Sequence, residues 1–474
     1  MNKSDSERIS TVIENMGFSW TNSEEEADLL GVIACSVRQK AIDKVYTKIS
    51  KWNKWKNNRN LVTFISGCVL PADREKFLKQ FDIIFKISEL PEFPEMIHQY
   101  GVVSSFTLRN GMTFDKVLET TLLTKPDFTT LSFDKNKKTI VGQPLLMKQP
   151  EEKIAGFWNV EPLYQSSFEA FVPIQNGCDK FCTFCAVPYT RGREISRPSE
   201  EILDEVKSLV EKGYKSITLI GQNVNSYGRD KTGKELNFYE LLRNIGEYGD
   251  SSVKDFWLYF TSPHPRDMSV EVLETIAKYK CLAKQIHLPL QSGDDQILIK
   301  MNRNHNLNDY RKIEESIRKI LPAATLFTDI IVGFTGETEE QFLNTFHAME
   351  EFRFNMAYIA RYSSRPGATS SRWDDDVLHA VKKDRLHRLS ELLQKHSFEL
   401  NKQLIGKTCK ILVIGSDRKG GFLSGLTEGK IIVRFASDDK SLIGKFVDIT
   451  IISAADFATE GELVGIYNEE LSAV

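Results

Sequence analysis

Six short apolar runs recur between residues 170 and 361, separated by helical patterns or polar loops. They cover residues 170–174, 216–220, 256–260, 285–290, 326–332 and 356–361. Between them, residues 199–212 and 306–319 have the spacing of amphipathic helices, and the first begins at Ser199 after Pro198. Strands that alternate with helices build parallel sheets, because each helix carries the chain back to the start of the next strand. We therefore predict an α/β fold in which residues 168–400 form a (β/α)6 partial barrel.

A shorter version of the same alternation lies in residues 1–107. One apolar run, at residues 29–34, ends at Cys35, and another, at residues 61–66, ends near Cys68. A helical pattern follows each run, which predicts a parallel α/β domain at the N-terminal end of the chain.

The remaining segments differ from this pattern. Residues 108–167 are of mixed character, and we expect a long connection with a small hairpin around residues 130–141. Leucines at helical spacing predict a long helix before residue 401, namely Leu386, Leu389, Leu393 and Leu400. Beyond it, short strands are expected at residues 409–415, 430–436 and 445–453. Residues 401–468 are therefore predicted to form a small all-β barrel.

Composition narrows the classes of function. A chain of 474 residues is too long for one hydrophobic core, which indicates several domains. The net charge of −3 gives no overall signature of nucleic-acid binding, so any RNA contact must use local basic patches. No run of about 18 apolar residues exists, and the first residues lack the apolar stretch of a signal peptide. We expect a cytoplasmic protein without a membrane segment, whose seven cysteines are reduced.

The most informative motif follows the first predicted barrel strand. Cys178, Cys182 and Cys185 are spaced by four and three residues, so that one tight loop presents three sulfurs. Gly177 before them allows the chain to turn sharply. Three thiolates bound to an iron–sulfur cluster leave one iron open to an exogenous ligand, as catalytic metals keep a vacant position.

Two other chemistries use the same residue type. A structural zinc site and a Cys-x-x-Cys redox pair are both built from cysteines. Zinc usually takes a fourth Cys or His, and none lies close in the sequence. We therefore favour the iron–sulfur interpretation, and we expect Phe181 and Phe184 to exclude water from the cluster.

Polar residues end the other predicted barrel strands, where barrel enzymes place their chemistry. A single polar loop is weak evidence, but polar ends on every strand favour a binding site. Asp329 stands inside an apolar strand and needs a partner, because a lone buried carboxylate is costly. The candidate cofactor-binding residues are Gly221, Gln222, Asn223, Gln291, Asp329 and Gly333.

These motifs resemble those of the radical-SAM methylthiotransferase family, and the similarity covers nearly the whole chain. It rests on residues 177–192, 196–198, 288–293 and 328–334. The family's domain order is an N-terminal methylthiotransferase domain, the radical-SAM barrel and a C-terminal TRAM barrel that binds RNA. Residues 35–41 and 187–192 resemble the tRNA branch, which makes 2-methylthio-N6-dimethylallyladenosine beside the anticodon, more than the ribosomal-protein branch.

The resemblance implies cofactors and partners. A cluster on Cys178, Cys182 and Cys185 would bind S-adenosylmethionine (SAM) and reduce it to a 5′-deoxyadenosyl radical, which abstracts hydrogen from C2 of the adenine. A second [4Fe–4S] cluster, with Cys35 and Cys68 among its ligands, would donate sulfur, and a second SAM would supply the methyl group. The implied partners are the tRNA anticodon arm and a reductant such as flavodoxin or ferredoxin, and we expect a monomer.

The sequence departs from the family at the second cluster. Cys35 and Cys68 match the second and third ligands, but the first belongs to a Gly-Cys-Gln-x-Asn segment whose end resembles Met1-Asn2. Either the sequence begins downstream of the natural start, or the protein lacks this ligand. We favour the first, because a whole strand is lost with the cysteine and leaves a sheet position uncovered. In both cases we predict that this chain holds the second cluster poorly.

Three other positions carry smaller expectations. Thr335 stands in a loop where the family commonly has proline, and we expect little effect. Cys281 and Cys409 match no ligand position, which favours buried apolar roles for both.

A lysine-rich segment is a candidate RNA surface. Trp52 and Trp55 are interleaved with basic residues, which suits phosphate tracking and base stacking. The alternative is a solvated amphipathic helix whose tryptophans pack inward. The basic residues are Lys40, Lys44, Lys48, Lys51, Lys54 and Lys56, and the helix at residues 382–402 and the C-terminal barrel are further candidates.

Three functions remain open at this point. The leading hypothesis is a tRNA methylthiotransferase. The second keeps the chemistry but changes the target to a small-subunit ribosomal protein or a threonylcarbamoyl-modified adenosine. The third is a non-catalytic RNA-binding iron–sulfur protein.

Overall fold

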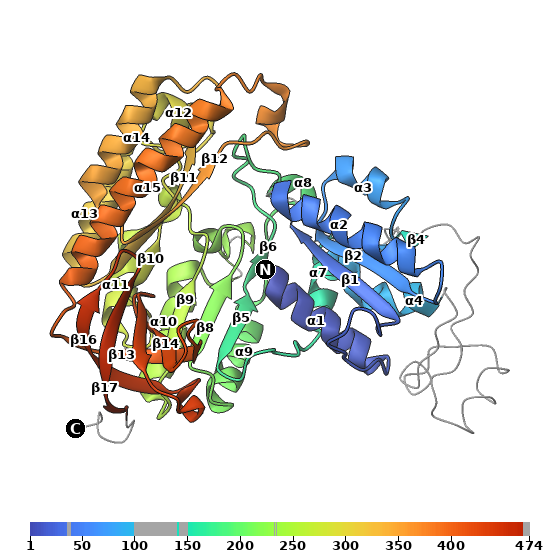
Figure 1. Ribbon diagram of the computed structural model, residues 1–474, viewed down its shortest axis with the longest axis horizontal. Coiled ribbons are helices and arrows are strands. Elements are labelled where there is room, and N and C mark those ends of the chain that lie inside the picture. Colours follow the sequence, from blue (N-terminus) through green and yellow to red (C-terminus); the bar gives the residue numbers. More distant parts are fainter. Residues whose placement is uncertain (36–38, 99–139, 142–149, 232, 234, 468–474) are drawn as a thin grey trace. The chain divides into compact units, whose positions relative to one another are not determined.

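The computed structural model describes residues 1–35, 39–98, 140–141, 150–231, 233 and 235–467 (Figure 1). The chain divides into two compact units. The first comprises Met1–Gln165, Ala186–Ile195 and Arg365–Gly367, and the second comprises Ser166–Cys185, Ser196–Ser364 and Ala368–Val474.

The first unit is built on a four-stranded parallel sheet in the order β1-β2-β3-β4. The strands are β1 (Leu29–Cys35), β2 (Val62–Cys68), β3 (Ile83–Ile84) and β4 (Ile140–Val141). The helices are α1 (Asn2–Asn15), α2 (Gln39–Trp55), α3 (Pro71–Phe77), η1 (Ile87–Glu92), α4 (Phe93–His98), α7 (Pro150–Trp158) and α8 (Val187–Arg191). The predicted parallel α/β domain is confirmed.

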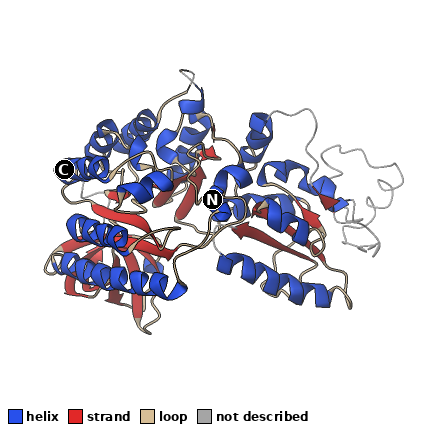
Figure 2. Ribbon diagram, turned by 90° about the horizontal axis from the view of Figure 1, so that it is seen from above, coloured by secondary structure: helices blue, strands red, loops and turns tan. Residues whose placement is uncertain are grey.

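Two hydrophobic clusters cover the two faces of this sheet, because side chains alternate along each strand. Val62 and Phe64 of β2 pack with α1, α4 and α7 on one face. Ile65 packs with α2 and α3 on the other. Figure 2 shows these strands between layers of helices. Of the hairpin expected around residues 130–141, only β4 lies within the described residues, and it pairs in parallel with β3.

The second unit contains the six predicted strands. They form two parallel three-stranded sheets, β5-β8-β9 and β10-β11-β12, and a bridge between Leu258 and Leu282 connects β9 to the chain entering β10. The strands are β5 (Glu169–Pro173), β8 (Ser216–Ile220), β9 (Trp257–Phe260), β10 (Gln285–His287), β11 (Thr325–Val332) and β12 (Met356–Arg361). Two short strands, β6 (Gln175–Asn176) and β7 (Ile195–Ser196), pair with each other. The (β/α)6 partial barrel is therefore confirmed.

Helices follow these strands as the sequence predicted. They are α9 (Ser199–Glu211), α10 (Phe238–Ser251), α11 (Val270–Lys278), α12 (Asp295–Lys300), α13 (Leu307–Ile320), α14 (Glu339–Phe352) and α15 (His379–Lys402). Short 3-10 turns are η2 (Val224–Ser226), η3 (Arg229–Lys231), η4 (Pro265–Asp267), η5 (Thr369–Arg372) and η6 (Lys440–Leu442). Within the described residues, no helix combines the length and the apolar character needed to cross a membrane.

The C-terminal strands close into the predicted small barrel, in the order β13-β14-β15-β17-β16. They are β13 (Thr408–Ser416), β14 (Phe422–Thr427), β15 (Ile432–Ala436), β16 (Phe446–Ala454) and β17 (Ala458–Ile466). The sequence missed β14 and β17, because glycines interrupt the apolar alternation of both.

This small barrel lies against the strand beginnings of the second unit. Leu412 and Phe446 share a hydrophobic cluster with Trp257 and Tyr259 at the start of β9. Thr325, the first residue of β11, donates its hydroxyl to the carbonyl of Gly429 at 2.7 Å. The small barrel thereby covers the amino ends of these parallel strands. The cysteine loop lies at their carboxyl ends.

Candidate metal centres

The three clustered cysteines lie at the carboxyl end of β5 and β6. Cys178 and Cys182 are buried and Cys185 is half-buried. Gly177 turns the chain with φ of +83°, and its N–H donates to Oε1 of Gln222 at 2.6 Å. The predicted turn before the first cysteine is therefore present, and Gln222, a predicted site residue, supports it.

Three thiols are the donors that the loop offers, and iron–sulfur clusters are held by cysteine thiolates. Within the described part of the chain, no three His, Cys, Asp or Glu side chains gather closely enough to hold one metal ion. A cationic side chain, Arg303, also places a guanidinium nitrogen 3.5 Å from Sγ of Cys182.

An ionised carboxylate lies beside the loop. Nζ of Lys180 is 2.5 Å from Oδ2 of Asp267, and the Asn223 amide donates to the same oxygen at 3.0 Å. Burial alone raises the pKa of Asp267, but these hydrogen bonds and the charges of Lys180 and Arg229 outweigh it, so that the pKa lies below its ordinary value. Sequence reasoning included Asn223 but missed Asp267 and Lys180.

Buried polar atoms without a hydrogen-bond partner in the described structure lie at the ends of neighbouring strands. They are Oε1 of Gln175, Oδ1 of Asn223 and Nε2 of His264. Nδ1 of His264 accepts from the N–H of Arg266 at 3.2 Å, which leaves the proton of the neutral ring on Nε2. Burial and the nearby Arg303 lower the pKa of His264 far below its ordinary value, so the ring is neutral. Two acceptors and one donor are therefore available to a polar ligand.

Gly221, the first of the predicted cofactor-binding residues, lets the Gln175 side chain lie close to its backbone. A Cβ at this position would stand 2.8 Å from Oε1 of Gln175, so a side chain here would displace that acceptor.

Three of the predicted cofactor-binding residues make internal contacts instead. Asp329 pairs with Nε2 of His287 at 2.9 Å, but its side chain is 35% exposed, so the expectation of a buried carboxylate is wrong. Gln291, at φ of +73°, continues the sheet through a bridge to Ile330. The N–H of Gly333 donates to Glu337, and a Cβ on Gly333 would meet the Lys382 side chain at 2.4 Å. Their ligand-binding roles remain predictions.

Two aromatic residues of the loop behave differently. Phe184 packs against the cluster formed by Ile297, Met301, Phe334 and Tyr362. Phe181 is 39% exposed and has a left-handed backbone conformation, with φ of +49°. The expectation that both residues exclude water from the cluster stays a prediction.

The two remaining cysteines of interest end the central strands of the first unit. Cys35 of β1 and Cys68 of β2 are register partners in the parallel pair. Neighbouring strands are about 4.8 Å apart, which brings the two backbones together at the same edge of the sheet.

Arg191, in the segment that carries the family resemblance, lies beside this pair. Its Nε–H donates to Sγ of Cys68 at 3.0 Å, and it forms an ion pair with Asp5 at 2.5 Å. Both charged side chains are almost completely buried, at 2% and 1% exposure. Burial alone lowers the pKa of the Arg191 guanidinium, but Asp5 and Cys68 outweigh it and raise the pKa.

The other two cysteines show no such surroundings. Cys281 is buried, and burial raises the pKa of its thiol to about 12. The thiol is therefore neutral, which suits an apolar role. Cys409 is half-buried and packs against the apolar core of the small barrel, so the expected apolar role holds for both cysteines, and full burial holds only for Cys281. Thr335 lies buried in the loop after β11.

The lysine-rich helix α2 is amphipathic, as the alternative interpretation held. Trp52 is buried, and its Nε1–H donates to Glu24. Lys48 and Lys51 pair with the same carboxylate. Glu24 therefore pairs with two of the six lysines that would contact phosphates.

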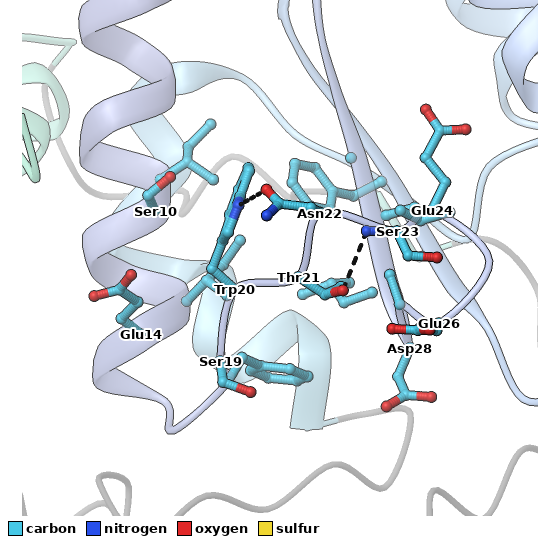
Figure 3. Close-up of a pocket in the computed structure, with 18 of the residues that line it drawn as sticks. Ser10, Glu14, Ser19, Trp20, Thr21, Asn22, Ser23, Glu24, Glu26 and Asp28 are labelled. Carbon is cyan, nitrogen blue, oxygen red and sulfur yellow. Dashed lines mark hydrogen bonds between the residues drawn. The ribbon is translucent and has the colours of Figure 1, made fainter. Parts of the chain in front are cut away.

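A cavity of about 960 Å³ lies beside α1 and β1 (Figure 3). Its polar lining includes Trp20, Asn22, Glu24 and Asp28. None of the cysteines, all of which are described, belongs to this lining, so the cavity is separate from both candidate metal centres.

Three family models match the chain in the order that the fold shows. They are "Uncharacterized protein family UPF0004" at residues 1–86, "Radical SAM superfamily" at residues 172–349 and "TRAM domain" at residues 402–464. A tRNA-2-methylthio-N(6)-dimethylallyladenosine synthase of Clostridium perfringens is 36% identical over 98% of this chain and 95% of its own length. This chain belongs to the radical-SAM methylthiotransferase family.

Other relatives agree with this membership. Synthases of the same name from Thermoanaerobacter pseudethanolicus and a Marinomonas strain are each 35% identical over 98% of the chain, and they are covered over 91% and 95% of their lengths. The solved structure of the cobalamin-dependent SAM radical enzyme OxsB matches 80% of this chain and 49% of its own at 14% identity, with a TM-score of 0.45. The family's cofactors are [4Fe–4S] clusters and SAM.

Proposed function

We propose that this chain is a tRNA methylthiotransferase, which adds a methylthio group to C2 of N6-dimethylallyladenosine next to the anticodon. The observation that carries the proposal is the full-length similarity to the synthases of that name, which spans all three domains. Cys178, Cys182 and Cys185 hold the cluster that binds SAM, and Cys35 and Cys68 are ligands of the second cluster. When bound, the two clusters supply the electron that cleaves SAM and the sulfur that is transferred.

The residues around the loop bind and orient the reactants. The open polar atoms of Gln175, Asn223 and His264 are suited to hydrogen-bond SAM, which is rich in donors and acceptors. The Lys180–Asp267 pair holds the loop in place at its outer side. Because the small barrel covers the amino ends of the strands, the substrate reaches the site from the carboxyl ends.

The partners follow from this proposal. The tRNA anticodon arm is the substrate, and the C-terminal barrel contributes to holding it. A small electron carrier such as flavodoxin or ferredoxin supplies the reducing electrons in the cytoplasm, and the enzyme works as a monomer.

Nucleoside analysis tests the target. A strain without the gene should lose the 2-methylthio group from tRNA hydrolysates, and the unmethylthiolated N6-dimethylallyladenosine should accumulate. Re-expression of this chain should restore the group only in part, because we predict that the chain holds the second cluster poorly, and re-expression of the Cys178→Ala variant should restore none. Unchanged tRNA nucleosides would reject the proposal, and loss of a modification from a ribosomal protein or from threonylcarbamoyl-adenosine would identify the alternative target.

A further inference from the structure

The last residue of α12 and the four that follow it, residues 300–304, lie against the cysteine loop and form the supporting segment. Four hydrogen bonds to or from the backbone of the loop join the two. They run from Thr183 N–H to Met301 O (3.0 Å), from Thr183 Oγ1 to Lys300 O (2.8 Å), and from Asn302 Nδ2 to Lys180 O (3.2 Å) and Phe181 O (3.1 Å). The supporting segment therefore holds the backbone directly before and after Cys182.

The contact stabilises a strained turn. Phe181 has φ of +49°, a left-handed conformation that is unfavourable for a residue with a bulky side chain. Asn302 itself has φ of +57°, a conformation that asparagine tolerates well. Asn302 can therefore adopt the left-handed backbone conformation while its side-chain amide donates to two carbonyls of the loop.

Arg303 reaches the sulfur of the middle cysteine. The residue is only 5% exposed, and one of its terminal nitrogens donates to the carbonyl of Pro289 at 2.9 Å. The other terminal nitrogen lies 3.5 Å from Sγ of Cys182. Nε has no partner within the described structure. A carbonyl after β10 thus fixes the guanidinium, which directs its charge at the sulfur.

We propose that Asn302 and Arg303 are positioning residues for the radical-SAM cluster, Asn302 by fixing the loop and Arg303 by bonding Sγ of Cys182. Hydrogen bonds to cluster sulfurs and nearby charge set the reduction potential of iron–sulfur clusters. A cation beside Cys182 stabilises the reduced, more negative cluster and raises its potential. This second part rests on the proposed function, because it requires a cluster at this loop.

The potential of the loop cluster tests Arg303. In a Cys35→Ala/Cys68→Ala background, which isolates this cluster, an EPR-monitored redox titration compares Arg303→Gln and Arg303→Lys with the parent. The potential should become more negative in Arg303→Gln, and Arg303→Lys should lie between, because it keeps the charge without the fixed geometry. An unchanged potential at equal iron content in Arg303→Gln would overturn the role of Arg303.

Hydrogen exchange of the cluster-free protein tests Asn302 without any cofactor. Asn302→Gly keeps the backbone conformation and removes the amide. Asn304→Gly is the matched control, because Asn304 has φ of +53° and its side chain bonds Asn302 and no loop residue within the described structure. Peptides covering residues 179–185 should exchange about tenfold faster in Asn302→Gly, from the loss of two hydrogen bonds. Equal exchange in both variants would overturn the role of Asn302.

The two measurements test the proposed function and the role of the supporting segment separately. If the parent protein assembles no cluster at this loop, the proposed function fails, and the exchange result still decides whether the supporting segment fixes the loop. If Arg303→Gln does not retain its cluster, the comparison of Arg303→Lys with the parent still decides whether the fixed guanidinium geometry sets the potential, because both carry the charge.

Discussion

The two candidate metal centres use cysteines that the chain brings together in different ways. Cys178, Cys182 and Cys185 belong to one loop, so their proximity follows from local spacing. Cys35 and Cys68 end two strands that are separated along the chain by α2, and only the parallel register aligns them. The first centre is therefore visible in the sequence, whereas the second depends on the fold of the whole unit.

The polar groups around the two centres also differ, in whether they have partners within the protein. Beside the loop, His264 and Asn223 keep polar atoms without partners in the described structure, and Arg303 pairs with no carboxylate in that part of the chain. Beside the strand pair, Arg191 is neutralised by Asp5 in a buried ion pair. The loop centre is thus prepared to accept a ligand, and the strand centre is prepared to hold its ligands rigidly.

The largest expected effect comes from the loop. Alanine in place of Cys178, Cys182 or Cys185 should reduce SAM cleavage to background, because each removes a cluster ligand. Anaerobic assay of 5′-deoxyadenosine measures it, and Cys409→Ala in the small barrel is the control that should keep activity. Cleavage that survives any of the three substitutions would remove that cysteine from the ligand set.

Substitution at the strand centre should separate the two halves of the reaction. Cys68→Ala should abolish formation of the methylthio product and leave SAM cleavage near the parental rate, because the two clusters have separate ligands. Product and 5′-deoxyadenosine are measured in the same reaction by mass spectrometry. Loss of both activities at equal iron content of the loop cluster would show that the centres are not independent.

Arg191 should matter for stability more than any surface cation. Arg191→Gln leaves Asp5 buried and unpaired, which costs about 3–5 kcal/mol. The exposed pair of Arg243 and Glu247 provides a contrast, since Arg243→Gln should cost about 0.5 kcal/mol or less. Urea unfolding of the cluster-free chain measures both. Equal costs for the two variants would mean that the buried ion pair contributes nothing beyond a surface pair.

A smaller, pH-dependent effect is expected at Asp267 beside the loop. The pKa of Asp267 lies below its ordinary value of 3.8 in the folded protein, because the bonds from Lys180 and Asn223 outweigh burial. Its stabilising contribution is therefore present above pH 3.8 and is lost as the pH falls through the folded pKa. Between pH 3 and pH 6, urea unfolding should show that the free energy of unfolding falls less steeply with acid for Asp267→Asn than for the parent, by at most about one proton. An identical slope in both proteins would refute the lowered pKa.

The sequence predicted the features that arise from local pattern. The six barrel strands, α9 and α13 follow from apolar runs and helix-start residues, and the cysteine loop follows from spacing. It missed β14 and β17, whose glycines obscure the alternation.

Contacts that cross the chain could not be predicted from one sequence. Arg303 meets Cys182 from 121 residues away, and no local pattern joins them. A usable signal was the Asn-Arg-Asn run at residues 302–304, because asparagines commonly mark left-handed turns. Trp52 was also ambiguous, because a buried and a stacking tryptophan have the same helical spacing.

The most direct test of the central claim is the iron and sulfide content per chain after anaerobic reconstitution. Relative to the parent, Cys178→Ala should lose about four irons, and Cys68→Ala should keep them. The iron that remains in Cys178→Ala measures how well Cys35 and Cys68 hold the second cluster. We predict that this chain holds it poorly, so little iron should remain. Iron content that does not change in Cys178→Ala, or zinc in place of iron in the parent, would contradict the assignment of a radical-SAM cluster to this loop.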